Sequence, residues 1–247
     1  MILKVENISK TFVTEGQEIK VLENINFEVE KGTFFSLIGP SGCGKSTLLR
    51  IIAGLLEPDS GKIKWGEEPK IGFVFQSYAL FPYLTIFENI EIGLKATGVP
   101  KDESRKQVLE LIKEVGLSGN EDKHPKELSG GMKQRVGIAR ALAISPNVLL
   151  MDEPFGSLDE FTAEDLRKLL LALWEKREIT AILVTHLISE ALELSDEIAV
   201  LSDKPSVIKG IVLNKSQRPR NLRSENFFKM EDRLKSLIVK KGLLENF

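Results

Sequence analysis

The sequence is poor in the residue types that build disulfides and metal clusters. Its 247 residues include one cysteine, Cys43, and two histidines, His124 and His186. A single thiol excludes an internal disulfide and an all-cysteine metal site, and two histidines are too few for a zinc or iron cluster. The fold must therefore depend on a hydrophobic core, for which the 42% of hydrophobic residues provide ample material.

Long apolar runs and an excess of one charge are also missing. The longest apolar candidates, such as 144–151, are far shorter than the roughly 20 residues that a membrane-spanning helix needs. The first ten residues lack the apolar core and cleavage site of a signal peptide, so we expect a cytoplasmic chain. The net charge of −2 gives no reason to expect nucleic acid as a partner.

The apolar pattern changes several times along the chain. Near the N-terminus, apolar and polar residues alternate around 3–8 and 25–29, as they do in half-buried strands. Four later runs are short, apolar and typical of buried parallel strands: 33–38, 71–75, 148–151 and 181–184. Between the last two lies a leucine stripe at helical spacing, at 166, 169, 170 and 173. This order predicts an α/β fold with a mostly parallel central sheet and an N-terminal antiparallel β subdomain.

Residues 77–127 interrupt this alternation. They contain an amphipathic segment with Val108, Ile112 and Val115 on one face, and no strand pattern follows it directly. We therefore expect a main domain over 1–213, with a helical subdomain inserted at about 77–140. A tail over 214–247 follows, with a helix predicted from 227 to 244.

A glycine-rich loop follows the first predicted buried strand. Residues 39–47, GPSGCGKST, match the phosphate-loop pattern G-x-x-x-x-G-K-[ST], in which backbone N–H groups point at phosphate oxygens. Lys45 would contact the β and γ phosphates, and the Ser46 hydroxyl would bind Mg²⁺. A chance match in such a chain has odds on the order of a percent. The predicted nucleotide-binding residues here are Gly39, Ser41, Gly42, Cys43, Gly44, Lys45, Ser46 and Thr47.

Two carboxylates end the apolar run at 148–151. Asp152 is placed to hold Mg²⁺, directly or through water, and Glu153 to polarise a water for attack on the γ phosphate. An apolar run followed by Asp-Glu is common by itself and can be a helix cap or a turn. The phosphate loop upstream makes the catalytic interpretation much stronger.

The segment Leu128–Arg135, LSGGMKQR, resembles the signature of the ATP-binding cassette (ABC) family. Without the family, Ser-Gly-Gly before a helix is either an anion-binding helix N-terminus or a serine-capped linker. Other segments follow in the family's order: Gln76 as the Q-loop glutamine, Ser157-Leu158-Asp159 as the D-loop and His186 as the switch histidine. Phe12 stands where the family places an aromatic residue that stacks on adenine. For His186 and Phe12 the alternatives are a buried structural histidine and a core phenylalanine.

The resemblance covers about residues 3–213 and implies a P-loop ATPase that binds ATP and Mg²⁺. Gln76 would act as a further metal ligand with Ser46 and Asp152, and the catalytic set would be Glu153, His186, Gln76 and Lys45. Two copies of the chain would enclose two ATP molecules, each held by the phosphate loop of one subunit and by Ser129, Gly130 and Gly131 of the other. Asp159 would also lie at the nucleotide.

The motifs are most similar to those of importers for nitrate, sulfonates, taurine and thiamine precursors. This implies a subunit on the inner face of the membrane, joined to integral permease subunits and served by a solute-binding protein. An exposed-looking surface at Tyr78, Leu80, Phe81 and Tyr83 suits such a partner, although local packing also explains it. The alternatives are a cassette of an exporter or lipid-extraction system, or a non-transport assembly ATPase. The solute is not identified by this sequence.

Overall fold

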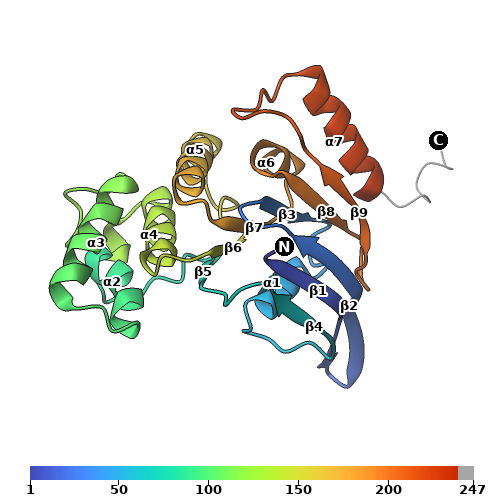
Figure 1. Cartoon of the computed structure of the whole chain (residues 1–247), viewed down its shortest axis with the longest axis horizontal. Helices are drawn as coiled ribbons and strands as arrows, with labels where there is room; N and C mark the ends of the chain where they lie inside the picture. Colours follow the sequence, from blue (N-terminus) through green and yellow to red (C-terminus); the bar gives the residue numbers. More distant parts are fainter. Residues whose placement is uncertain (239–247) are drawn as a thin grey trace. The chain divides into compact units, whose positions relative to one another are not determined.

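The computed structural model describes residues 1–238, which form parts of two compact units. Unit 1 comprises Met1–Glu68 and the chain from Ile182 onward, and unit 2 comprises Pro69–Ala181 (Figure 1). The strands are β1 (Leu3–Thr14), β2 (Gln17–Val29), β3 (Phe34–Ile38), β4 (Ser60–Trp65), β5 (Ile71–Val74), β6 (Val148–Asp152), β7 (Thr180–Thr185), β8 (Glu197–Leu201) and β9 (Ile208–Leu213). The helices are α1 (Lys45–Ile52), α2 (Ile86–Ala96), α3 (Lys101–Glu114), the 3₁₀ turn η1 (Pro125–Glu127), α4 (Gly130–Ala143), α5 (Glu160–Arg177), α6 (Ile188–Leu194) and α7 (Glu225–Ile238).

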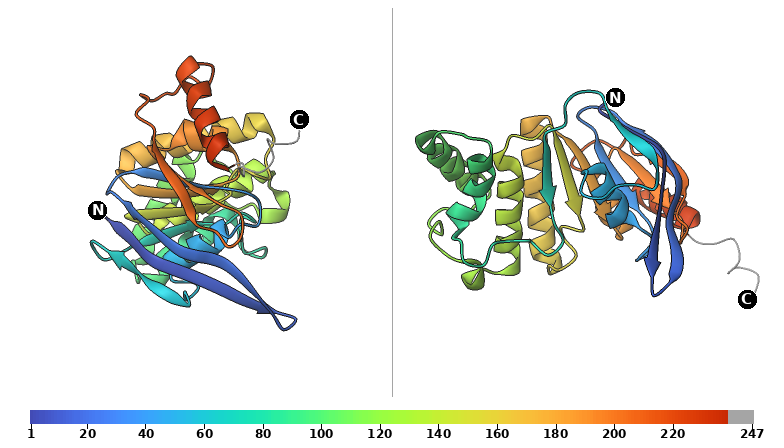
Figure 2. Two further views of the ribbon diagram at one scale, coloured as in Figure 1. Left: turned by 90° about the vertical axis from the view of Figure 1, so that its right-hand side faces the viewer. Right: turned by 90° about the horizontal axis from the view of Figure 1, so that it is seen from below.

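The first sheet of unit 1 has the strand order β2-β1-β4 and is antiparallel. The register pairs Leu3 with Val29 and Val5 with Phe27. These four side chains are at most 5% exposed, because period-2 alternation brings them to the buried face. The long β1–β2 hairpin is visible in both views of Figure 2. The predicted N-terminal antiparallel β subdomain is confirmed.

The second sheet has the strand order β5-β6-β7-β3-β8-β9. Strand β3 runs parallel to β8 and β5 runs parallel to β6, whereas β9 is antiparallel to β8. Every residue of β3, β6 and β7 is buried, which explains why these strands appear as continuous apolar runs in the sequence. The predicted α/β fold with a mostly parallel central sheet is confirmed, and the ends of the four predicted buried strands differ by at most one residue.

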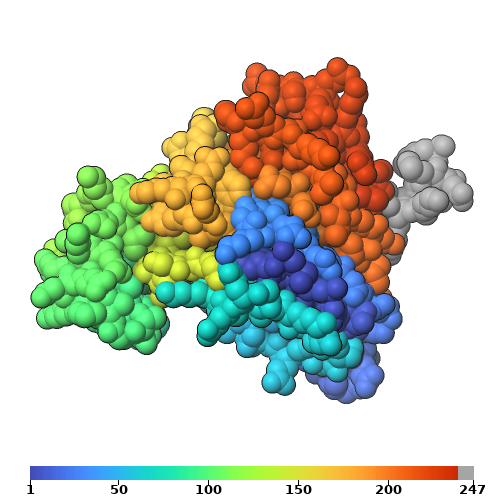
Figure 3. Space-filling view, viewed as in Figure 1, coloured from blue at the N-terminus to red at the C-terminus, as the bar shows by residue number. Residues whose placement is uncertain are grey.

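Helices α6 and α7 cover one part of unit 1. Leu192 of α6 and Phe227 and Leu234 of α7 pack in one core cluster with Ile198 and Val212 of β8 and β9. Figures 1 and 3 show the C-terminal segment, in red, lying against the orange segment that contains β8 and β9. Helix α7 begins at Glu225; residues 239–244 of the predicted tail helix lie outside the described residues.

Unit 2 contains the helices α2 to α5. Val108, Ile112 and Val115 are fully buried, so the predicted inward face of this amphipathic segment is confirmed. Helix α2 begins at a capping box, in which Thr85 and Glu88 satisfy each other's backbone N–H groups. Within residues 1–238, no helix combines the length and apolar character needed to cross a membrane.

Candidate nucleotide site

The phosphate loop of unit 1 joins β3 to α1. Gly44 caps α1 with a φ of 113°, a conformation that side-chain-bearing residues rarely adopt. A Cβ on Gly44 would also lie 2.6 Å from Cγ1 of Val21 in β2. No side-chain hydrogen bond caps α1, and the N-terminus of a helix favours the binding of anions. The glycine at this position is therefore required by the shape of the loop.

Lys45 lies at the first position of α1 and is 4% exposed. Its ammonium group donates hydrogen bonds to the carbonyl oxygens of Gly39 (2.9 Å) and Pro40 (3.0 Å). The Lys45 side chain thus spans the loop from its end to its beginning. An ammonium held in this position can contact phosphate oxygens that bind to the loop's N–H groups.

Ser206 supports the phosphate loop from a distant part of the sequence. This fully buried residue precedes β9, and its hydroxyl donates to the carbonyl oxygen of Cys43 and lies 3.0 Å from the Ser202 carbonyl. Its backbone N–H donates to the Val21 carbonyl oxygen at 2.9 Å. Cys43 itself is 2% exposed and fills space inside the loop. The sequence predicted Cys43 but missed Ser206, because no motif marks a contact between residues so far apart.

We expect Ser206→Ala to weaken ATP binding about twofold to tenfold, since a typical hydrogen bond contributes about 0.5–1.5 kcal/mol. The loop would lose the hydroxyl that fixes the Cys43 carbonyl and would sample more conformations before binding. Calorimetry with ATP measures the change. Ser236→Ala, which alters an exposed hydroxyl in α7, is the matched control. An ATP affinity equal to that of the wild type would refute this supporting role.

His186 follows β7 and is exposed. The flanking Thr185 hydroxyl accepts from the Leu187 N–H at 3.1 Å and donates to the carboxylate of Glu190, which is 4% exposed. This turn holds the backbone on both sides of the histidine. The exposure of His186 excludes the alternative of a buried structural histidine at a strand end.

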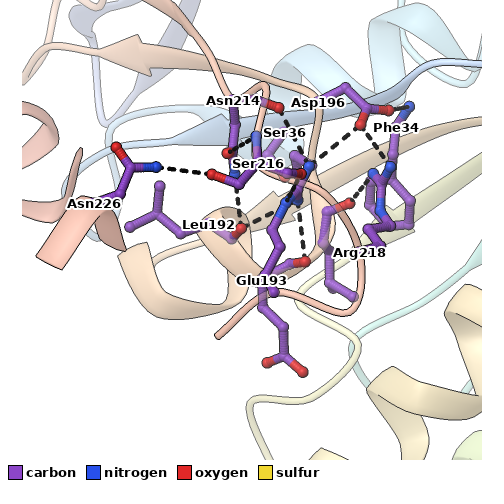
Figure 4. A network of polar contacts seen from close by, with 12 residues as sticks. Phe34, Ser36, Leu192, Glu193, Asp196, Asn214, Ser216, Arg218 and Asn226 are labelled. Carbon is purple, nitrogen blue, oxygen red and sulfur yellow. Dashed lines mark hydrogen bonds and ion pairs between the residues drawn. The ribbon is translucent and has the colours of Figure 1, made fainter. Parts of the chain in front are cut away.

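A polar network ties the C-terminal segment to the end of α6, the helix that follows His186 (Figure 4). Arg220 donates to the carbonyl oxygens of Leu192 and Glu193, both at 3.1 Å, and to Asp196 at 3.3 Å. Arg218 donates to the Leu194 carbonyl oxygen at 2.6 Å. Burial, and then the nearby Arg218 charge, lower the pKa of Arg220 to about 10, so it remains protonated at neutral pH. The two arginines therefore satisfy the carbonyl groups that end this helix.

Phe12 lies on β1 with 38% of its surface exposed. Its ring centroid lies 5.7 Å from the Lys10 ammonium, which also pairs with Asp59 at 2.7 Å. A phenylalanine with this exposure is not a core residue, which excludes that alternative. Its ring offers a π face of the kind on which a base stacks.

Unit 2 carries the two carboxylates. Asp152 ends β6 and is 4% exposed. Glu153 follows with a φ of 45°, a left-handed conformation that is uncommon for a residue with a side chain. The Gln76 amide Nε2 lies 3.4 Å from Glu153 Oε2, so the Q-loop glutamine and the predicted base are in contact. The two adjacent carboxylates thus differ in burial and in backbone conformation.

The signature and the D-loop each begin a helix in unit 2. Ser129 caps α4 and accepts from the Met132 N–H at 3.3 Å, and Asp159 caps α5 and accepts from the Thr162 N–H at 3.0 Å. The Thr162 N–H also lowers the pKa of the Asp159 carboxyl group. A Cβ on Gly131 would lie 2.5 Å from the Thr162 methyl group. The glycine therefore allows the N-termini of α4 and α5 to approach closely.

The segment after Gln76 is only partly the exposed surface that the sequence predicted. Phe81 and Tyr83 are 37% and 72% exposed, whereas Tyr78 and Leu80 are half-buried. The fully buried Asn89 organises this segment, because its amide accepts from the Phe81 N–H and donates to the carbonyl oxygens of Phe81, Leu84 and Thr85. Sequence reasoning missed this anchor.

Known proteins with similar sequences and folds identify the family of this chain. A family model described as ABC transporter matches residues 22–156. An aliphatic sulfonates import ATP-binding protein of Bacillus cereus is 46% identical, and the alignment covers 99% of each chain. A bicarbonate transport ATP-binding protein of Synechocystis is 42% identical, over 89% of this chain and 81% of the relative. The ATP-binding cassette MJ0796, solved as a dimer bound to ADP and Pi, is similar with a TM-score of 0.79 and 34% identity, over 87% of this chain and all of the other. The chain therefore belongs to the ABC transporter family, as an ATP-binding subunit that hydrolyses ATP.

Proposed function

We propose that this chain powers the import of a solute through separate membrane subunits, as a homodimer attached to the inner face of the membrane. The contact between Gln76 and Glu153 is the main support for the proposed catalytic residues. Both residues lie in the same unit as the signature helix, which Ser129 caps. The direction of transport is supported by the relatives whose names describe import. The membrane subunits and a solute-binding protein would select the solute.

The residues of unit 1 bind the nucleotide in this proposal. The phosphate loop, from Gly39 to Thr47, surrounds the phosphates with N–H groups, and Lys45 neutralises part of their charge. Phe12 stacks on the adenine ring. His186 contacts the γ phosphate, and the turn at Thr185 and Glu190 fixes its backbone position.

Hydrolysis needs a metal ion and a base. The metal ligands proposed are Ser46, Gln76 and Asp152, whose hydroxyl, amide and carboxylate oxygens are the donors that Mg²⁺ prefers. Such an ion would neutralise charge that develops on the phosphate oxygens. Glu153 orients the attacking water and accepts its proton. Gln76, in contact with Glu153, holds the carboxylate in place.

The partner subunit completes each site. Ser129, Gly130 and Gly131 present the N-terminus of α4 to the γ phosphate bound by the other copy, where N–H groups and the helix dipole stabilise negative charge. Asp159 at the start of α5 lies beside the nucleotide in the same arrangement. Since each site needs both copies, an isolated monomer is expected to hydrolyse ATP slowly.

We predict that Ser129→Arg abolishes ATP turnover and leaves ATP binding to the mutant's own phosphate loop intact. Arginine removes the cap of α4 and places a long side chain where the other subunit's phosphate must approach. Ser129→Asn is the matched control, because asparagine caps helices as well as serine does. Steady-state hydrolysis and calorimetry measure the two effects. Normal turnover by Ser129→Arg would contradict the shared site.

Mixing variants tests whether the signature acts on the other subunit. A dimer of one Ser129→Arg chain and one Lys45→Ala chain retains one complete site, formed by the loop of the first and the signature of the second. An equimolar mixture should therefore hydrolyse more ATP than either variant alone. A mixture no more active than the sum of its parts would indicate that each subunit uses its own signature.

Transport itself is tested by reconstitution. The chain is purified with the membrane subunits encoded next to it and inserted into vesicles, with ATP supplied on the side that carries the cassettes. Import predicts that the solute accumulates on the side that holds ATP. Movement of solute away from that side would favour an exporter, and failure to bind any membrane subunit would favour a non-transport ATPase.

A further inference from the structure

Two consecutive residues after Gln76 adopt left-handed backbone conformations. Tyr78 has a φ of 61° and Ala79 a φ of 48°, values that are uncommon outside glycine, asparagine and aspartate. Such conformations persist where neighbouring groups determine them. Here Arg140 of α4 supplies that constraint, since its guanidinium donates to the carbonyl oxygens of Ala79 (2.6 Å) and Tyr78 (3.0 Å). The backbone is thus fixed to the helix that begins at the signature.

The fixed backbone directs the Tyr78 side chain to the D-loop. Its phenolic oxygen lies 2.8 Å from the Ser157 hydroxyl oxygen, 79 residues further along the chain. Ser157 belongs to the tight turns that connect Glu153 to Leu158, in which the Gly156 N–H donates to the Glu153 carbonyl oxygen at 3.3 Å. A hydrogen bond at Ser157 therefore acts on a short segment that starts at the proposed base.

The same phenolic oxygen lies beside the signature. A Cβ added to Gly130 would meet it at 3.1 Å and would meet a Leu158 methyl group at 3.3 Å. The Q-loop, the D-loop and the first residue of the signature helix thus converge around one tyrosine hydroxyl. All three segments belong to unit 2, and Gln76 of the same loop contacts Glu153.

We propose that Tyr78 is a positioning residue that keeps the D-loop and the signature aligned with the Q-loop. This inference rests on the proposed function, in which Glu153 serves the subunit's own ATP and the signature serves the ATP of its partner. Because Tyr78 holds the D-loop and the signature together, a change at one ATP site alters the geometry of the other ATP site. The Tyr78 hydroxyl therefore contacts another segment of the same chain, whereas Phe81 and Tyr83 are the exposed residues of this segment.

The test removes the two hydroxyl groups separately and together. Tyr78→Phe keeps the ring, Ser157→Ala removes the partner, and Ser118→Ala, at an exposed turn of unit 2, is the matched control. We expect each single variant to lower kcat about twofold to tenfold, the range that corresponds to one hydrogen bond. We also expect unchanged ATP affinity at the phosphate loop and a Hill coefficient for ATP closer to 1. The double variant should be no slower than the slower single variant, because both changes break the same contact.

Ser157→Thr retains a hydroxyl and should restore most of the lost rate. Independent effects that multiply in the double variant, or single variants with wild-type kcat and Hill coefficient, would overturn the proposal. A fall in thermal stability without a change in kcat would likewise assign Tyr78 to local packing and overturn it. The mixing experiment with Ser129→Arg and Lys45→Ala tests the shared sites with Tyr78 intact, so failure of the proposed function and failure of this inference are distinguishable.

Discussion

Glu153→Gln is expected to lower kcat about 10²- to 10⁴-fold, the usual contribution of a positioned general base. Glutamine has the same shape, and its amide oxygen can still accept from Gln76, so the contact and the left-handed backbone at this position can persist. What is lost is the ability to take a proton from water. ATP binding depends on the phosphate loop and should be unchanged.

A chain that binds ATP but cannot cleave it should accumulate as a dimer. Two bound ATP molecules stabilise the associated state by mass action, and hydrolysis no longer removes them. Gel filtration with Mg-ATP should show a dimer for Glu153→Gln and mostly monomer for the wild type. The control is the same variant with ADP, which lacks the γ phosphate that the signature contacts. Continued hydrolysis with wild-type amounts of dimer would show that another group is the base.

The parts of the fold that the sequence predicted are those with local chemistry. Strands β3, β6 and β7 are apolar throughout because both faces of the sheet are covered at these positions, so a short window of sequence suffices to identify them. The phosphate loop and the signature are likewise contiguous. Some of their glycines are required by close contacts, such as the approach of Val21 to Gly44.

The parts that the sequence did not predict depend on pairs of residues far apart in the chain. Ser206 and Cys43 are separated by 163 residues, and Tyr78 and Ser157 by 79. A serine or a tyrosine in a polar segment gives no periodic signal that indicates its partner. The sequence analysis groups Tyr78 with Phe81 and Tyr83 as one exposed-looking surface, whereas only the latter two are exposed. The left-handed backbone conformations of Tyr78 and Ala79 cannot be derived from composition.

The tail illustrates the same limit. The sequence predicts a helix in the tail but does not predict that Arg218 and Arg220 donate to the carbonyl groups of α6. Two arginines around a proline are common in exposed segments. Here the carbonyl groups at a helix end, together with Asp196, provide enough acceptors to make burial of Arg220 favourable. The tail is therefore bound to the helix that follows His186.

Lys45→Ala is expected to weaken ATP binding about tenfold to a hundredfold, because a hydrogen bond to a charged group contributes about 1.5–3 kcal/mol. Two effects combine in this variant. The phosphates lose a cation, and the loop loses the two hydrogen bonds to the carbonyl oxygens of Gly39 and Pro40 that hold its beginning to its end. Calorimetry with ATP measures the sum.

The two effects separate when the nucleotide is varied. AMP lacks the β and γ phosphates that Lys45 is proposed to contact, so the affinity for AMP should fall less than the affinity for ATP if the charge dominates. A loosened loop would instead weaken both nucleotides. Lys45→Met is the matched control for the aliphatic part of the side chain, since methionine fills similar space without the ammonium group. Lys45→Arg keeps the charge but not the compact ammonium that reaches both carbonyl oxygens, so we expect partial recovery. If Lys45→Ala bound ATP with the affinity of the wild type, Lys45 would not contribute to ATP binding.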